Sequence, residues 1–355
     1  MEKAPVPYPP VLHSLASAST ITWLIHQKFE LSIPLYRQEK EWEALGLRLS
    51  RATMSNWLLV VYRDWLIHIV HRLKQELLKQ RYLHIDETHV QVLKEPGRKN
   101  TSDSYMWVYC SIRDAVNPIR YFEYQPGRSG KYPEAFLREY EGYIHTDAYS
   151  GYNAVSGVKR CLCYTHLRRA FVDALPKDIH NSEASKPAEA ILRLNQLFNI
   201  ESELEALPPD QKKKERLIRE KPLLEAFWSW AEKSAIGELP KSKLSKAFHY
   251  ALNNREGFWN YLEDGNCSIS NSLAENCIRP FVIGRKNWLF SGSPKGAEAS
   301  AGIYTLVETA KANGLAPMKY IKYILSDMPG SAFLEHPEYL DDYLPWNPLV
   351  KEFCR

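Results

Sequence analysis

The spacing of apolar residues changes along the chain, and the changes divide it into segments with different predicted structures. Residues 1–20 are rich in Pro, Ser and Ala, a composition typical of an extended arm. Residues 21–78 are predicted to be helical. Near Arg81 the pattern becomes that of β-strands, rich in aromatic and β-branched residues. From about residue 181 to residue 265 the strand signal disappears and helical spacing returns.

Between residues 81 and 180, strands and helices are predicted to alternate. The first three strands are joined by short turn-forming segments, which favours an antiparallel meander. Strands are expected at residues 81–93, 104–114, 118–124, 143–149 and 158–166, and helices at residues 130–140, after residue 151 and at residues 166–175. The order β-β-β-α-β-α-β-α is that of a ribonuclease H-like sheet. We therefore expect an α/β fold with a ribonuclease H-like mixed sheet.

Helices are then predicted to interrupt this sheet before the chain returns to it. Residues 181–265 are expected to form a helical insertion between a first part of the core, residues 79–180, and a second part, residues 266–328. The basic run Lys212–Arg216 in the insertion is typical of a solvated helix face, and we assign it no function. An Ala-rich helix ended by a glycine and one last helix are expected near the C-terminus. The tail, residues 329–355, is expected to wrap the surface.

Two predicted helices within residues 35–65 have the spacing of a helix-turn-helix motif. The first is expected to end at Gly46, and Ser50 is expected to cap the second. Arg51 and Asn56 then lie near the N-terminal part of the second helix, where such motifs contact DNA. The alternative is a pair of packed amphipathic helices with no role in nucleic-acid binding.

The composition is that of an ordinary globular protein. Of the 355 residues, 45% are hydrophobic and 25% are charged, and no run approaches the ~20 apolar residues needed to cross a bilayer. The N-terminus lacks the pattern of a secretory signal, so we expect a cytoplasmic protein with reduced thiols and no membrane partner. The six cysteines form no CxxC pair, and no dedicated zinc module is visible. A net charge of +4 permits a polyanionic partner without requiring one.

Two aspartates fall in or at the end of apolar strands. An ionised carboxylate removed from water is costly unless a cation or hydrogen-bond donors compensate it. Asp86 lies inside the first predicted strand, and Asp147 lies at the end of the fourth. Because the first and fourth strands of such a sheet are neighbours, the pair predicts a metal site. A capping or ion-paired role for each aspartate is the alternative.

A third acid is expected from a helix that returns to the sheet. Glu275 lies in the first turns of that helix, with Ser270 or Asn271 as its cap. Three convergent carboxylates suit a pair of Mg²⁺ ions, with Mn²⁺ as a substitute, because hard cations prefer oxygen ligands and two of them can clamp a phosphodiester. The structural alternative is a helix pair between Glu275 and Arg279, four residues on.

Cations and aromatic residues interleave just after Glu275. Arg285, Lys286 and Trp288 suit a phosphate backbone and an unstacked base together, although the segment is also compatible with a surface loop anchored by Trp288. DNA contacts are therefore predicted for Arg51, Asn56, Arg168, Arg169, Arg279, Arg285, Lys286 and Trp288.

A Cys and a His stand three residues apart ahead of two of these arginines. Cys163 and His166 supply two of the four ligands that a structural zinc ion needs, and Cys161 adds one more candidate. We favour a structural or site-supporting role for Cys163 and His166 over zinc binding.

The sequence also resembles the transposases of the insertion sequence 66 family over nearly its whole length. The resemblance is carried in order by residues 32–57, HIDETHVQVL, IHTDAYSGY, CYTHLRRAF, residues 271–317 with the string GRKNWLF, and LPWN. It implies a catalytic triad of the DDE type, and the matching positions are Asp86, Asp147 and Glu275. It also implies a helical segment between the second and third acids.

Members of that family usually carry a further N-terminal region, with a coiled coil and a cysteine-rich metal-binding module, upstream of the segment that matches residues 3–5. We expect that this region does not precede the present sequence and that recognition of the inverted-repeat ends is weakened. The resemblance also implies accessory proteins of the same mobile element, and transposases commonly act as homo-oligomers on paired ends.

The expected function is therefore that of a DNA transposase. It would bind the terminal inverted repeats of its mobile element, nick them to expose 3′-hydroxyls and transfer those ends into target DNA. One alternative is a ribonuclease H-like nuclease that does not join DNA. Another is a shortened, inactive DNA-binding relic or regulator.

Overall fold

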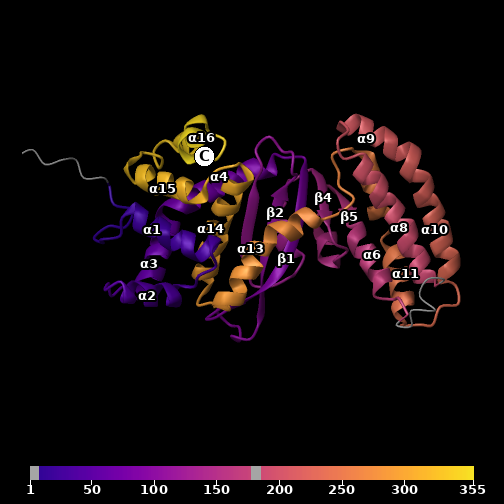
Figure 1. The fold of residues 1–355 in the computed structure, drawn as a ribbon, viewed down its shortest axis with the longest axis horizontal. Helices are drawn as coiled ribbons and strands as arrows, with labels where there is room; N and C mark the ends of the chain where they lie inside the picture. The colour runs from indigo at the N-terminus through magenta and orange to yellow at the C-terminus, as the bar shows by residue number, and fades with distance from the viewer. Residues whose placement is uncertain (1–7, 177–184) are drawn as a thin grey trace, which may run out of the picture. The chain divides into compact units, whose positions relative to one another are not determined.

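The computed structural model describes residues 8–176 and 185–355, which include a six-stranded mixed sheet (Figure 1). The strand order is β3-β2-β1-β4-β5, and β6 also pairs with β1. Neighbours are parallel in the pairs β1–β4, β4–β5 and β1–β6, and antiparallel in the pair β2–β3. The strands are β1 (Tyr82–Val92), β2 (Asp103–Ser111), β3 (Arg120–Gln125), β4 (Gly142–Thr146), β5 (Val158–Leu162) and β6 (Phe290–Ser291). The expected mixed α/β architecture is confirmed.

The chain divides into two compact units, and the division falls within β1. The first unit contains the chain up to Gln80, Asp86–Tyr132 and Leu273–Arg355. The second unit contains Arg81–Ile85 and Pro133–Ser272. The helical segment after β5 therefore belongs to the same unit as β4 and β5.

The N-terminal helices belong to the first unit. They are α1 (Ala18–Ile25), continued by the π-helix η1 (His26–Glu30), α2 (Leu35–Ala44), α3 (Arg51–Val61), continued by the π-helix η2 (Tyr62–Leu66), and α4 (Ile67–Leu78). Part of the expected arm, residues 1–7, lies outside the described residues. The rest is anchored, because Ala16 is buried and the Trp65 indole donates a hydrogen bond to the Pro10 carbonyl at 2.8 Å. Helix α1 begins two residues before the expected end of the arm, where the Ser17 hydroxyl accepts from the Thr20 amide.

The two helices predicted from residues 35–65 are present. Helix α2 ends two residues before Gly46, which has a φ of +86°. Ser50 caps α3, since its hydroxyl accepts from the Thr53 amide at 3.1 Å. Met54 and Leu58 are buried, while Arg51 and Asn56 are exposed. The DNA-binding role of this pair stays a prediction.

The long Ala-rich helix α14 (Pro294–Ala312) packs against β3 in the first unit. Two of its threonines accept hydrogen bonds from main-chain amides of that strand. Thr305 accepts from the Phe122 amide at 2.8 Å, and Thr309 accepts from the Arg120 amide at 3.0 Å. Gly314 ends the helix with a φ of +70°, as the sequence predicts.

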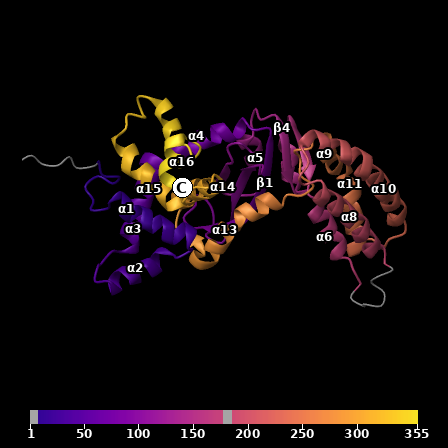
Figure 2. The same cartoon turned by 45° about the horizontal axis from the view of Figure 1, so that its top comes forward.

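The C-terminal helices also belong to the first unit. They are α13 (Ser272–Trp288), α15 (Pro317–Asp327) and α16 (Pro348–Cys354), with two 3-10 helices, η6 (Met328–Gly330) and η7 (Pro337–Tyr343). Helix α15 packs between α1 and α16 (Figure 2). The tail contributes to the core, because Phe333, Tyr343 and Val350 are buried.

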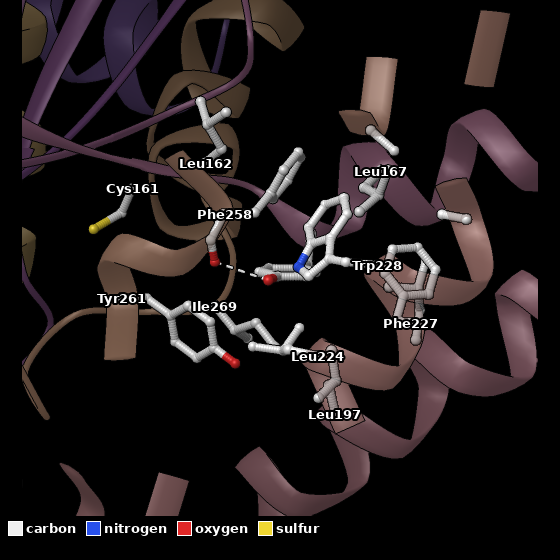
Figure 3. Close-up of a cluster of buried hydrophobic side chains, with 14 of the residues drawn as sticks. Cys161, Leu162, Leu167, Leu197, Leu224, Phe227, Trp228, Phe258, Tyr261 and Ile269 are labelled. Carbon is white, nitrogen blue, oxygen red and sulfur yellow. Dashed lines mark hydrogen bonds between the residues drawn. The ribbon is translucent and has the colours of Figure 1, made fainter. Parts of the chain in front are cut away.

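The second unit is built from β4, β5 and a helical bundle. Its elements besides the strands are α5 (Lys131–Phe136), η3 (Ser150–Ala154), α6 (Tyr164–Val172), α8 (Lys186–Glu203), α9 (Pro209–Glu215), the π-helix η4 (Arg216–Glu220), α10 (Lys221–Ala235), α11 (Lys243–Asn253), α12 (Arg255–Trp259) and η5 (Asn260–Glu263). Helices α6, α8, α10 and α11 pack side by side (Figures 1 and 2). Phe227, Trp228 and Phe258 fill the core between them (Figure 3).

Two details of this unit differ from the predictions. The expected helix between the fourth and fifth strands is a single 3-10 turn, η3, because β5 begins at Val158 and leaves no room for a longer helix. The basic run Lys212–Arg216 is also not wholly solvated. Arg216 is fully buried and forms an ion pair with Glu201.

Candidate active site

Asp86 lies within β1, where it interrupts a run of apolar positions. Leu83 and Ile85 are fully buried, and Asp86 is half-buried. Its carboxylate accepts a hydrogen bond from the Glu87 amide at 2.9 Å. The next carboxylate, that of Glu87, is nearly inaccessible to solvent and pairs with Arg128 at 2.6 Å. Asp86 is therefore held in a polar stretch of an otherwise apolar strand.

Asp147 is the first residue after β4, at the carboxyl end of that strand. Its carboxylate accepts from the Tyr149 amide at 3.0 Å, which closes a tight turn of the Asx type. Arg160, in β5, fixes this turn from the other side by donating to the carbonyls of Asp147 and Tyr149 at 2.6 and 2.8 Å. The same guanidinium donates to the Thr146 hydroxyl at 2.7 Å.

Arg160 was not among the residues singled out from the sequence. Its role depends on pairing between β5 and β4, and nothing in the string of residues around it marks that pairing. In the structure it acts as a positioning residue for the main chain that carries Asp147.

The two aspartates occupy equivalent places on neighbouring parallel strands. In the β1–β4 pairing, His84 lies opposite His145. Asp86 follows His84 by two residues, and Asp147 follows His145 by two residues. The prediction that the first and fourth strands are neighbours is confirmed.

Glu275 lies in the first turn of α13 and is half-buried. The chain just before this helix is fixed to β1 by Asn271, which is buried. The side-chain nitrogen of Asn271 donates to the Ile85 carbonyl at 2.8 Å, and the side-chain oxygen accepts from the His84 ring at 3.0 Å. Both ends of the Asn271 side chain thus bind the strand, whereas the sequence suggested this residue as a helix cap. The entry to α13 is tied to the residue that precedes Asp86.

Cys163 and His166 lie at the start of α6. Cys163 is buried, and its sulfur accepts from the main-chain amide of Asn271 at 3.1 Å. Burial raises the pKa of the Cys163 thiol, but hydrogen bonds from His166 and from the Asn271 main chain outweigh it, so that the pKa is lowered overall. This contact is consistent with a supporting role for Cys163. Cys161 does not join this pair: it lies with His145 and Cys267.

The residues predicted to contact DNA are spread over three helices: α3, α6 and α13. Arg169, Arg279 and Lys286 are exposed, as are Arg51 and Asn56. Two are engaged within their own unit. Arg168 donates to the Asn195 side chain at 2.7 Å, and Arg285 donates to the Thr88 hydroxyl at 3.1 Å and to the His89 carbonyl.

The segment around Trp288 is helical, so its interpretation as a surface loop is wrong. Helix α13 continues through Pro280 to Trp288, and Gly284 allows this part of the helix to approach Tyr304 of α14 closely. Trp288 packs against Phe281 with ring centroids 5.4 Å apart. Arg285 and Lys286 therefore project from the last turns of a helix.

The family model described as "Transposase IS66 family" matches residues 13–299, so the chain belongs to the IS66 family of transposases. Three uncharacterised proteins of Sinorhizobium fredii are similar over almost the whole chain. The protein y4hP is 25% identical, over 98% of the chain and 65% of its own length. The protein y4qI is 28% identical, over 94% of the chain and 63% of its own length. The protein y4jD is 25% identical, over 97% of the chain and 68% of its own length. The chain thus spans about two-thirds of the length of these relatives. Among the described residues, no helix is long and apolar enough to cross a membrane.

Proposed function

We propose that this protein is a DNA transposase of the DDE type with a ribonuclease H-like catalytic core, and that Asp86, Asp147 and Glu275 hold its catalytic metal ions. Membership of a transposase family supports the reaction class. The observation that carries the choice of residues is the equivalent offset of Asp86 and Asp147 from paired positions on adjacent parallel strands.

The third acid is supported by the attachment of its helix. Asn271 binds the carbonyl of Ile85, and the next residue of that strand is Asp86. Glu275 follows Asn271 by one helical turn. These contacts support Glu275 as the third acid, because they attach the start of its helix to the strand that bears Asp86.

The donor set fits a hard divalent cation. The three candidates are carboxylates, and Asp86 and Glu275 are half-buried, where an ionised carboxylate benefits from a cation. When bound between such groups, Mg²⁺ or Mn²⁺ activates water or a 3′-hydroxyl and stabilises the charge on the leaving oxygen. The role of the protein is to hold the carboxylates. Arg160 fixes the turn that presents Asp147, and Asn271 fixes the start of the helix that presents Glu275.

DNA contacts are proposed for the exposed polar residues of α3 and the basic end of α13. The Arg51 and Asn56 side chains are available on α3, and Lys286 is exposed near the end of α13. The DNA ends, a homo-oligomer on paired ends, and accessory proteins of the same mobile element complete the proposed assembly.

Strand transfer with pre-nicked end DNA and a target plasmid tests this proposal. We expect joined product with Mg²⁺ or Mn²⁺, and none from Asp86→Asn, Asp147→Asn or Glu275→Gln. Duplex binding by these variants should stay close to that of the parent, because the carboxylates act on the metal and not on the bases. Asp173→Asn, which removes an acid from the end of α6, is the matched control. Joining at the parental rate by the Asp86 or Asp147 variant would remove that residue from the mechanism, and cleavage without joining would indicate a nuclease.

A further inference from the structure

Three side chains of the second unit that commonly bind metals lie together, and none of them is among the three acids. They are His145 in β4, Cys161 in β5 and Cys267 in the segment before α13. Their ligand atoms all lie within 4.8 Å of one another. Each of the three residues is only 1% exposed. Cys161 lies at the edge of the hydrophobic cluster, with its sulfur directed away from the aromatic rings (Figure 3).

The hydrogen bonds of His145 fix its tautomer. Its Nδ1 lies 3.1 Å from the Leu83 carbonyl, which can only accept, so Nδ1 carries the proton. Its Nε2 accepts from the Ser268 amide at 2.9 Å and therefore has the lone pair. An imidazole whose protonated nitrogen binds a main-chain carbonyl is the usual form of a metal-ligating histidine.

The donor set selects the kind of ion. Two sulfurs and one imidazole suit a borderline-soft cation better than Mg²⁺ or Ca²⁺, which prefer oxygen. Two thiolates also neutralise a divalent ion, whereas a monovalent ion would leave a net negative charge in a buried place. Zn²⁺ meets both conditions and accepts three protein ligands with a neutral water as the fourth.

We propose that His145, Cys161 and Cys267 bind a Zn²⁺-class ion that fastens β4 and β5 to the segment leading into α13. On binding, both thiols lose their protons to solvent, and the Nε2 lone pair exchanges the Ser268 hydrogen bond for the metal. Because all three ligands are buried, we assign the ion a structural role. Asp147 follows His145 by two residues and Asn271 follows Cys267 by four, so the ion would hold the chain just before Asp147 and just before the segment that leads into α13.

The test is metal binding by the full chain, purified in reductant without chelator. Elemental analysis should find about one Zn²⁺ per chain, and the Tm should be lower in chelator than with added Zn²⁺. Co²⁺ added in its place should give a sulfur-to-cobalt charge-transfer band, which carboxylates do not produce. These measurements use the parent protein and do not depend on how well any variant folds.

Variants then assign the ligands. Cys161→Ser and Cys267→Ser should each weaken Zn²⁺ binding more than about tenfold and remove the charge-transfer band. Cys354→Ser, which changes a buried cysteine of the first unit, should keep both. Asp147→Asn should also keep both, which separates this site from the carboxylate site. The proposal is overturned if the parent binds no Zn²⁺, or if the Cys161 and Cys267 variants bind it as the parent does. It is also overturned if the reduced parent takes no metal and the oxidised parent has lost two hydrogens, which would indicate a Cys161–Cys267 disulfide instead.

Discussion

Arg216 is the centre of a buried polar network in the helical unit, and Arg216→Met tests how much that network stabilises the fold. The guanidinium donates to both oxygens of Glu201, at 2.5 and 2.8 Å. It also donates to the carbonyls of Tyr261, Asp264 and Cys267, at 3.0, 3.1 and 2.8 Å. Methionine fills a similar volume with a flexible apolar side chain but offers no donor.

The expected loss follows from what the substitution leaves behind. Removing one partner of a buried ion pair leaves an uncompensated charge and costs about 3 to 5 kcal/mol. Lys212 lies 3.3 Å from the Glu201 carboxylate and retains part of the compensation. We therefore expect the lower end, about 3 kcal/mol. With a urea dependence of about 3 kcal/mol per molar, this lowers the unfolding midpoint by about 1 M.

Urea unfolding followed by circular dichroism measures this change, and hydrogen exchange localises it. Peptides from α8 and α10 should exchange faster in the Arg216→Met protein, while peptides from α14 should not. The control is Arg219→Met, which removes an exposed ion pair with Glu203 from the same short helix and should leave the midpoint almost unchanged. Equal midpoints for the two variants would refute the claim that the buried network stabilises this unit.

Two further predictions concern neighbouring contacts. Burial and the charge of Glu201 raise the pKa of Glu220 to about 8 from 4.5. Between these pH values the folded protein holds a proton that the unfolded chain releases. The free energy of unfolding should therefore fall as the pH rises from about 5 to about 8, by at most about 1.4 kcal/mol per pH unit. Glu220→Gln should flatten this part of the stability curve measured by urea unfolding at several pH values, and an equally steep curve would contradict the assignment. Asn271→Ala removes two buried hydrogen bonds to β1, which should cost roughly 2 to 4 kcal/mol and lower strand transfer far more than duplex binding. Asn276→Ala, which changes an exposed residue of α13, should leave both unchanged. An active Asn271 variant would show that the helix start needs no such anchor.

The parts of the fold that could be predicted are those set by local chemistry. Ser50 caps α3 because a hydroxyl before a helix accepts from its first free amides. Gly314 ends α14 because its φ of +70° favours glycine. The strands were visible because apolar and β-branched residues concentrate in them. Asp86 and Asp147 were visible because acids are rare in such runs.

The parts that could not be predicted depend on partners far along the chain. Arg216 belongs to a basic run that has the composition of a solvated face, yet Glu201 and three main-chain carbonyls surround it. Arg160 acquires its role only when β5 pairs with β4. The segment up to Trp288 is helical through Pro280 and Gly284 although both residues have weak helix propensity, and Tyr304 of α14 lies against it, a contact that the local sequence does not show. Cys161 was considered together with Cys163, and residues two apart in one strand share a face. In the structure β5 ends at Leu162 and Cys163 is the N-cap residue of the next helix, α6, so the strand pattern does not apply to this pair.

The short segment from Asp264 to Asn271 links the end of the helical insertion to α13. Five of its eight residues are held by other parts of the second unit: Asp264 and Cys267 by Arg216, Ser268 by His145, Ile269 by Tyr164, and Asn271 by Ile85 and Cys163. Arg216 comes from the insertion, while the other partners come from β1, β4 and the start of α6. The insertion therefore contributes directly to fixing the path along which the chain reaches α13. Because a carboxylate that binds a metal must be positioned to within a fraction of an ångström, the proposed role of Glu275 would depend on how firmly this segment is held.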